Sequence, residues 1–370
     1  MTKIWKTVMW SLKAAYSGYF PTEDVDGNPI IGEQAGKPLA GGLRFVLWSI
    51  KADLDHWANA YGLSHYNSNE PCEFCPANRK GHFKGWHNYF GHDATWKSKC
   101  FSARQWRQLY LEPELHFLFD MPYLSCHNLE PDELHVMHLG TSQYMLGAVL
   151  FILCFQVLAG TPEDNLHDIW TEINQFYIDY SVKTQYSSLK ISAFYEPGQF
   201  PKLKGKGAEI KDLVAPLAHV WKTHTRGSNV RSHNHITAML EHELSAQRIL
   251  HDHKYMVFLP EQTAMEFAQA IDGVLVRWSF VANASDSVGE NIWNTPTKLH
   301  YLYHLGQKAM FLNPRKGNTM LEETYMGVCK TLAKSCLNST DDHNMPKFFM
   351  EKYHWALHFT YLYGERFVPP

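Results

Sequence analysis

The sequence predicts an α+β protein that is mostly helical, with a short strand region near its N-terminus. Hydrophobic residues make up 45% of the 370 residues, which is enough to form a substantial core. A run of strand type, LRFVLWSIKAD, occupies residues 43–53. Most of the chain after residue 130 instead places apolar residues at helical spacing.

The other elements follow from the same periodicity. Residues 4–16 are apolar along one helical face, and SGYFP ends this helix. Residues 21–42 are rich in Pro, Gly and Asp and are expected to form a loop. Residues 66–100 are irregular, so something other than a core must hold them. A long, increasingly apolar helix is entered near residue 130, and further helices are expected at 54–60, 163–185, 208–225, 229–250, 261–283, 293–310, 321–336 and 346–360.

Charge and cysteine content exclude several classes of protein. The net charge of −3 carries no polycationic signature, so nucleic-acid binding would need a local patch. Of seven cysteines only Cys72 and Cys75 are closely spaced, which favours a reduced, intracellular protein.

The N-terminus lacks the apolar core of a signal peptide. The longest apolar run, 145–160, is too short to span a membrane and contains Gln156, so we expect a buried helix and no membrane partner.

The cysteine pair has the spacing of half a metal site. Two thiolates in a Cys-x-x-Cys turn, here Cys72 and Cys75, suit a tetrahedral Zn²⁺. A redox motif would need a thioredoxin-type context, which this segment lacks. Ordinary buried or surface cysteines are the alternative interpretation.

A histidine pair offers the other half. His300 and His304 in LHYLYH stand at i and i+4, so both imidazoles lie on one helix face and can reach one metal. The alternative is coincidence, because the chain has 22 His and close pairs such as His251 and His253 also occur.

Two acids lie at equal offsets from these pairs. Asp53 ends the strand-type run, where a carboxylate can be rigidly aimed, and Cys72 follows 19 residues later. Glu323, at the start of a helix, follows His304 by 19 residues. One zinc bound by both pairs would join segments more than 220 residues apart and bring the two acids close together.

The motif DELHVMHLG at 132–140 places Asp132 and His135 at i and i+3 where a helix begins. Its alternative interpretation is an acidic first turn that interacts favourably with the helix dipole.

A lysine-rich stretch, PKLKGKGAEIK at 201–211, has glycines that allow close backbone approach. Its alternative interpretation is a solvated loop. The candidate contacts to DNA phosphates in and after this stretch are Lys202, Lys204, Lys206, Lys211, Arg226 and Arg231.

In their order along the chain these motifs resemble those of the DDE transposases, which have an RNase H-like fold. The similarity is to the CACTA-like branch, kin to the recombination-activating recombinase of jawed vertebrates, and it covers roughly residues 43 to 330. We prefer Glu323 to Glu322 because ETYMG matches the family pattern E-x-[YF]-[ML]-G. The matching stretches are LWSIKAD with Asp53, PCEFC with Cys72 and Cys75, DELHVMHLG with Asp132 and His135, KLHYLYH with His300 and His304, FLNPR with Asn313 to Arg315, and EETYMG with Glu323.

The resemblance implies a partial RNase H-like core, with its first strands missing, that is interrupted by a large all-helical insertion domain and carries a zinc-stapled loop. The family's first catalytic Asp precedes the strand of the second, and here only Asp24 and Asp26, in a loop, precede Asp53. The chain is therefore expected to be an N-terminally truncated transposase. The implied segments are 1–65 with the partial core, 66–130 with the first zinc half-site, 131–292 as the helical insertion, and 293–370 with the second half-site and the catalytic Glu.

In the intact family, carboxylates bind Mg²⁺ or Mn²⁺ for DNA cleavage and strand transfer. The resemblance makes Asp53 and Glu323 two of these acids, and it places His135 and Asp132 beside them. It also implies structural Zn²⁺, transposon-end DNA as partner and a nuclear location, and it permits a homodimer. Without a third acid, the chain alone is expected to be inactive and poorly soluble. The alternatives are a transposase-derived, zinc-stabilised module that binds DNA or protein without cutting, and a product without function.

Overall fold

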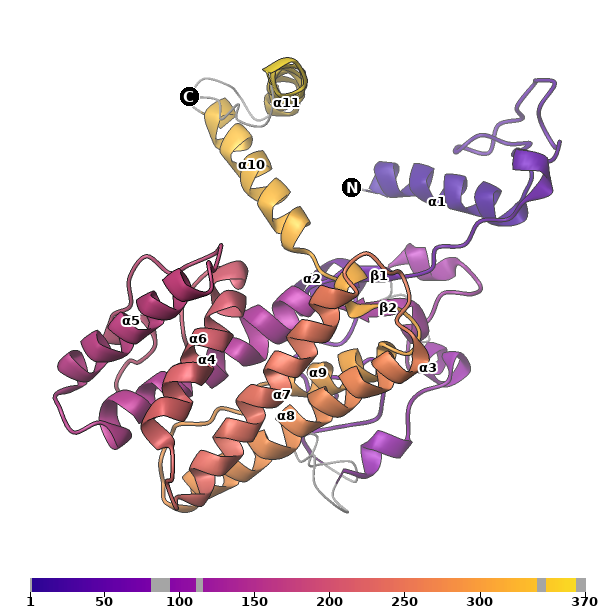
Figure 1. Ribbon diagram of the computed structural model, residues 1–370. Helices are drawn as coiled ribbons and strands as arrows, with labels where there is room; N and C mark the ends of the chain where they lie inside the picture. The colour runs from indigo at the N-terminus through magenta and orange to yellow at the C-terminus, as the bar shows by residue number, and fades with distance from the viewer. Residues whose placement is uncertain (1, 81–93, 111–115, 338–343, 364–370) are drawn as a thin grey trace. The chain divides into compact units, whose positions relative to one another are not determined.

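A computed structural model describes residues 2–80, 94–110, 116–337 and 344–363 (Figure 1). The chain divides into two compact units, Met1–Gly317 and Asn318–Pro370. This boundary falls within the segment 293–370 that the sequence predicts as one region. Each unit is described by itself.

The first unit is mostly helical, as predicted. Two helices are shorter than expected: α5 ends at Asp179, and α9 begins only at Thr297 because Pro296 disfavours helical backbone before it. The helices are α1 Thr2–Ser17, α2 Leu54–Tyr61, α3 Ala103–Leu109, α4 Gln143–Ile152, α5 Pro162–Asp179, α6 Gly207–Thr225, α7 Arg231–Asp252, α8 Glu261–Ser287 and α9 Thr297–Lys308.

Two short parallel strands form the only sheet in the part of the chain that is described. Strand β1, Ile50–Ala52, pairs with β2, Leu129–Pro131, so that Ile50 faces Leu129 and Ala52 faces Pro131. The predicted strand over 43–53 is therefore too long, because only its last residues meet a partner strand. Ile50 is thereby paired and buried, whereas Phe45 and Val46 earlier in the same run are exposed.

The predicted long helix after residue 130 is interrupted in its geometry. Residues Leu134–Ser142 (η6) and Leu153–Val157 (η7) are π-helical and flank α4 without a break. Among the residues described, only the segment Leu134–Val157 is long and apolar enough to cross a membrane. Of its most apolar 18 residues, 83% are buried inside the protein.

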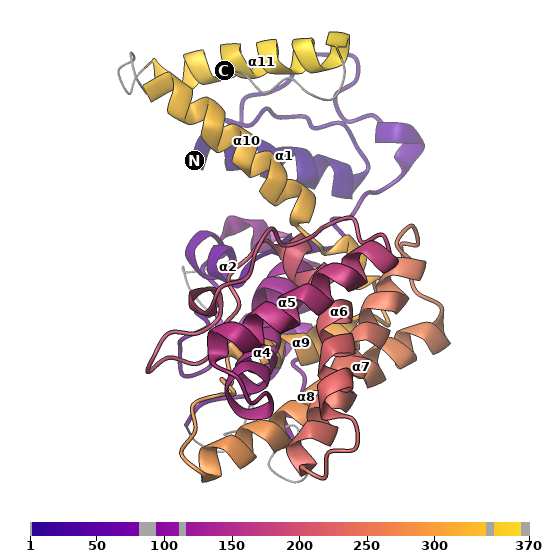
Figure 2. The same cartoon turned by 60° about the vertical axis from the view of Figure 1, so that its left-hand side comes forward.

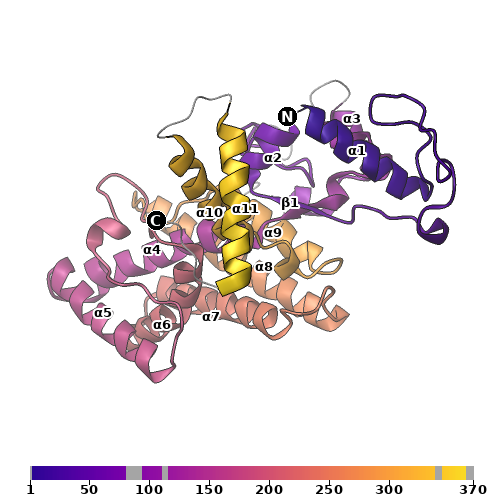
Figure 3. The ribbon, with the colours of Figure 1, turned by 90° about the horizontal axis from the view of Figure 1, so that it is seen from above.

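Helix α9 lies among the elements that form the site. It packs against β2, against η6 and against α8. Helices α8 and α9 are labelled in Figure 3. Helices α7 and α8 run side by side (Figure 1), and α5 packs against α6 (Figure 2). Fully buried tryptophans fill the core of this unit: Trp57, Trp96, Trp106, Trp221 and Trp278.

The second unit consists of α10, Met320–Leu337, packed against α11, Met345–Tyr363. Tyr325 and Tyr353 meet edge to face with ring centroids 6.2 Å apart. Glu322 and Glu323 both lie in the exposed first turn of α10, so the preference for Glu323 stays a prediction.

Candidate metal centre and the adjacent cleft

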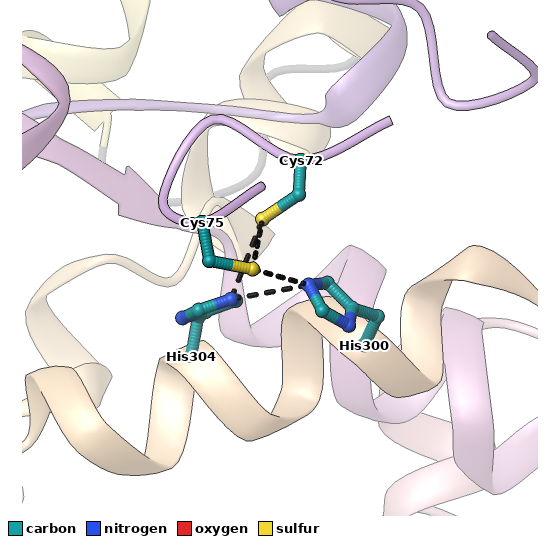
Figure 4. A group of neighbouring side chains, drawn as sticks. All are labelled: Cys72, Cys75, His300 and His304. Atoms are coloured by element: carbon teal, nitrogen blue, oxygen red, sulfur yellow. Dashed lines mark hydrogen bonds between the residues drawn. The ribbon is translucent and has the colours of Figure 1, made fainter. Parts of the chain in front are cut away.

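Two cysteines and two histidines from distant segments converge in the first unit (Figure 4). Cys72 and Cys75 project from one turn, and His300 and His304 project from one face of α9. The sulfurs of the cysteines are 3.6 Å apart and the Nε2 atoms of the histidines 3.2 Å apart. Each sulfur lies 3.3 Å from one imidazole Nε2, Cys72 from His304 and Cys75 from His300.

These distances match the edges of a zinc tetrahedron. With Zn–S near 2.3 Å and Zn–N near 2.05 Å, two sulfurs should lie about 3.8 Å apart and two nitrogens about 3.3 Å apart. All four side chains are buried, as in structural zinc sites whose coordination is closed to solvent. The predicted donor set therefore fits Zn²⁺.

Burial also shifts the pKa values of two of the ligands, Cys72 and His304. It raises the pKa of the Cys72 thiol well above its usual value, and the neighbouring Cys75 adds to this rise. It lowers the pKa of His304 well below its usual value, with a further contribution from His300. The His304 imidazole is therefore neutral, which is the form that binds metal, and zinc binding would displace a proton from the Cys72 thiol.

Glu73, between the two cysteines, anchors the turn from inside. Its buried carboxylate accepts hydrogen bonds from Trp106 Nε1 at 2.8 Å, from the Tyr110 hydroxyl at 2.7 Å and from Ser64 N at 2.7 Å. The irregular region is thus held by polar bonds and the metal ligands together, which the sequence analysis anticipated without naming Glu73.

Aromatic rings close the metal centre on the helix side. Trp96, which is fully buried, packs on the His300 ring with centroids 4.3 Å apart. The hydroxyl of Tyr301 donates to Pro71 O at 2.8 Å, so α9 and the cysteine turn are joined next to the ligands.

Asp53 stands where β1 ends, as predicted. Its carboxylate accepts a hydrogen bond from His56 N at 2.6 Å and thereby caps α2. Because Ala52 faces Pro131 in the parallel pair, Asp53 and Asp132 are the next residues of neighbouring strands. Asp53 and Asp132 therefore lie next to each other at the carboxyl ends of the two parallel strands.

Asp132, which is buried, pairs with the partly buried His135 at this end of the sheet. Asp132 accepts from Leu134 N at 3.0 Å and also hydrogen-bonds His135 Nδ1. Burial lowers the pKa of His135, but the bond to Asp132 and the charges of Asp132 and Asp53 outweigh it and raise this pKa above its usual value. A carboxylate oxygen of Asp53 lies within 4.8 Å of a His135 ring nitrogen.

A cleft of about 760 Å³ opens beside Asp53 and His135. Three cationic side chains also line it: Arg79, Lys202 and Lys298. Burial lowers the pKa of Lys298 to about 8, and the charge of Lys202 acts in the same direction. The cleft thus combines carboxylate, imidazole and cationic groups, a set suited to an anionic substrate.

The six predicted DNA contacts do not all lie together, although Lys202 and Lys204 line one cavity of about 220 Å³. Lys202 lines the cleft, whereas Lys204 pairs with Glu196 at 2.5 Å and Lys211 lines a separate small cavity beside Glu133. Lys206 and Arg226 flank the two ends of α6, and Arg231 lies over the Phe280 ring at 5.6 Å.

Two cleft residues, Arg79 and Lys298, were not predicted from the sequence. Their positions carried a signal, because Arg79 follows Cys75 by four residues and Lys298 precedes His300 by two. The bond from Arg315 Nη1 to buried Glu133 at 3.3 Å was not predicted either, and it gives the FLNPR motif a structural role.

The remaining predicted acids lie elsewhere in the chain. Glu323 belongs to the second unit, so its pairing with Asp53 stays a prediction. Asp24 accepts hydrogen bonds from Asn28 within its loop, and Asp26 pairs with Lys6 at 3.0 Å.

Comparison with protein-family models, with curated proteins and with solved structures returned no match.

Proposed function

We propose that this chain is a DNA-binding domain of the DDE transposase type, in which a structural zinc holds together a cleft that receives the phosphodiester backbone. The observation that supports this most directly is the convergence of Cys72, Cys75, His300 and His304 from segments at least 225 residues apart. These are the two half-sites that the ordered motifs of the resemblance require. An RNase H-like core around β1 and β2 is part of the same proposal.

The arrangement of the cleft agrees with a phosphodiester substrate. Arg79, Lys202 and Lys298 supply positive charge for phosphate oxygens. His135, which Asp132 holds through its Nδ1, stands beside Asp53 and can donate to a phosphate oxygen. DNA would thus be the partner, with the nucleus as the place of action.

Catalysis would require a divalent metal held by several oxygens. A bound Mg²⁺ or Mn²⁺ would activate the attacking hydroxyl and stabilise the leaving oxygen. Within the first unit, the carboxylates that line the cleft are Asp53 and Asp55. Glu323 would add a further ligand only if α10 brings it to the cleft.

The second candidate is a zinc-stabilised module that binds DNA without cutting it. One observation favours it: the Asp53 carboxylate already caps α2, which is a structural role. The loop acids Asp24 and Asp26 are held by Asn28 and Lys6, and neither lines the cleft. We therefore expect the chain alone to bind DNA and to leave it intact.

Fluorescence anisotropy with a labelled duplex DNA tests binding, and conversion of supercoiled plasmid in Mg²⁺ or Mn²⁺ tests nicking. We expect micromolar binding that weakens steeply with salt, and no nicking. The Lys202→Met variant should bind more weakly than wild type. The absence of binding at low salt would refute the proposal, whereas nicking that Asp53→Asn abolishes would favour the catalytic form over the second candidate.

A further inference from the structure

We infer that Arg79 and Lys298 form a phosphate-binding subsite that the metal centre assembles, so that zinc binding and phosphate binding strengthen each other. The ligand class is a phosphodiester or pyrophosphate anion. This inference rests on the proposed function for its natural ligand, DNA, but the subsite itself is argued from contacts within the first unit.

Each half of the metal centre carries one cation into the cleft. Arg79 continues the cysteine turn four residues after Cys75, and its backbone N–H is fixed by Asn69 O at 2.9 Å. Lys298 lies in the first turn of α9, two residues before His300. The two cations therefore come from segments that the four metal ligands join.

A second link joins these two segments at the cleft itself. Arg79 Nη2 donates to Thr297 Oγ1 at 3.3 Å and to Tyr66 O at 3.0 Å. The Thr297 hydroxyl donates to the same Tyr66 oxygen at 2.9 Å. The guanidinium is thus held against the start of α9, next to Lys298, and a guanidinium presents a fork of donors that matches phosphate oxygens.

Close backbone packing positions the lysines of the cleft. A Cβ on Gly140 would come within 3.0 Å of Lys298 Cδ, so the lysine stem lies directly against η6, and its Nζ donates to Leu139 O at 3.0 Å. A Cβ on Gly147 would come within 2.8 Å of Lys202 N, so α4 holds that lysine equally closely. Lys298 is half-buried and belongs to the cleft wall, whereas the side chain of Lys202 is exposed and lies over the Tyr144 ring at 5.1 Å.

The coupling follows from this construction. Without zinc, the buried ligands lose the bonds that hold the cysteine turn against α9, and only the hydrogen bonds of Thr297 and Tyr301 keep Arg79 near Lys298, so we expect their separation to vary more. A phosphate that contacts both cations bridges the same two segments from the cleft side. By linkage, an anion that binds the assembled state more tightly must stabilise zinc in its site.

Zinc transfer from the full-length, zinc-loaded chain to a coloured chelator tests this coupling. The rate of zinc transfer is measured without an added anion, with duplex DNA and with pyrophosphate. We expect both anions to slow the transfer about fivefold or more. Lys298→Met and Arg79→Gln should each abolish the slowing and weaken DNA binding about tenfold, whereas Lys298→Arg should retain both properties because it keeps the charge.

The matched control is Lys222→Met, which removes a lysine that pairs with Glu241 on the exposed surface, away from the cleft residues. It should behave as wild type. The zinc content of each variant shows whether it is correctly folded. If Lys298→Met does not retain zinc, the effect of the anions on zinc transfer is measured on Arg79→Gln instead.

The outcomes separate the inference from the proposed function. DNA that binds without slowing zinc transfer overturns the coupling and leaves the proposed function intact, as does slowing that persists in both cleft variants. Slowing by pyrophosphate that needs Arg79 and Lys298, in a chain that binds no DNA, supports the subsite and refutes the proposed function.

Discussion

At the level of single residues, Glu130 in β2 shows how burial changes a carboxyl group. Its side chain is 3% exposed, and its Oε1 has no hydrogen-bond partner among the residues described. Oε2 lies 3.7 Å from Lys308 Nζ. Burial raises the pKa of Glu130 to about 7 and lowers the pKa of Lys308, so the cost of desolvating both charges exceeds their mutual attraction.

Glu130→Gln should therefore change how stability depends on pH. The folded carboxyl holds its proton up to a pKa of about 7, against 4.5 ordinarily, so wild type binds more protons when folded and loses stability as pH rises between these values. The glutamine side chain does not titrate, so the variant lacks this loss of stability with rising pH. The free energy of unfolding of the variant, relative to that of wild type, should therefore rise by on the order of 3 kcal/mol between pH 4 and pH 8. Urea unfolding at the two pH values measures this difference. An equal difference between the two proteins at both pH values would contradict the prediction.

At the level of elements, the π-helical segment η6 positions two residues of the cleft. It contains His135, and its Leu139 carbonyl accepts a hydrogen bond from Lys298. π-Helical turns are rare and occur frequently at functional sites. Here the segment begins two residues after Asp132 and contains His135. Gly140 allows it, because a Cβ at this position would lie 2.6 Å from His135 O.

Gly140→Ala should consequently be destabilising although alanine favours helices. The clash is with a backbone carbonyl, which cannot move without disturbing η6, so we expect a loss of about 1–3 kcal/mol in the free energy of unfolding. DNA affinity should fall too, because Lys298 would be displaced.

Gly327→Ala in α10 is the matched control. A Cβ there meets nothing within 4 Å, so this variant should be neutral or gain up to about 1 kcal/mol. Equal stability changes in the two variants would show that the close approach at Gly140 has no energetic consequence.

At the level of the whole molecule, the metal centre closes a very long loop. Cys72 and His304 are 232 residues apart, and the segment between them contains most of the first unit. Cross-links that close long loops restrict the unfolded chain strongly. The described parts of the irregular region, 66–80 and 94–100, contain one short 3-10 turn, Thr95–Ser98, so their structure should depend on zinc.

Cys75→Ser should abolish binding of the single zinc and lower the free energy of unfolding by more than about 4 kcal/mol, because the remaining buried ligands lose their common partner. Metal analysis and thermal unfolding measure the two effects. Cys100→Ser, at an exposed cysteine, is the control and should retain zinc and stability. A Cys75→Ser protein that still binds one zinc per chain would show that the four residues are not the ligand set.

The sequence by itself determined the features that depend on local spacing. Helical periodicity placed most helices within a few residues of their observed ends, because an apolar face repeats along the segment itself. The Cys-x-x-Cys turn and the i, i+4 histidines carry their geometry in a few neighbouring residues, so the donor set of Cys72, Cys75, His300 and His304 was predictable. The acid at the end of β1 was predictable for the same reason.

Tertiary structure alone decided which residues surround the cleft. Arg79 and Lys298 line it because the two metal half-sites meet, and this proximity is not a property of either segment. The predicted strand was too long because its length depends on the partner strand, which is 79 residues away in the chain. Of the six predicted DNA contacts, Lys202 lines the cleft, whereas Lys211 lines a different cavity beside Glu133. Local spacing determines which face a side chain shares with its neighbours, but only long-range packing determines what that face meets.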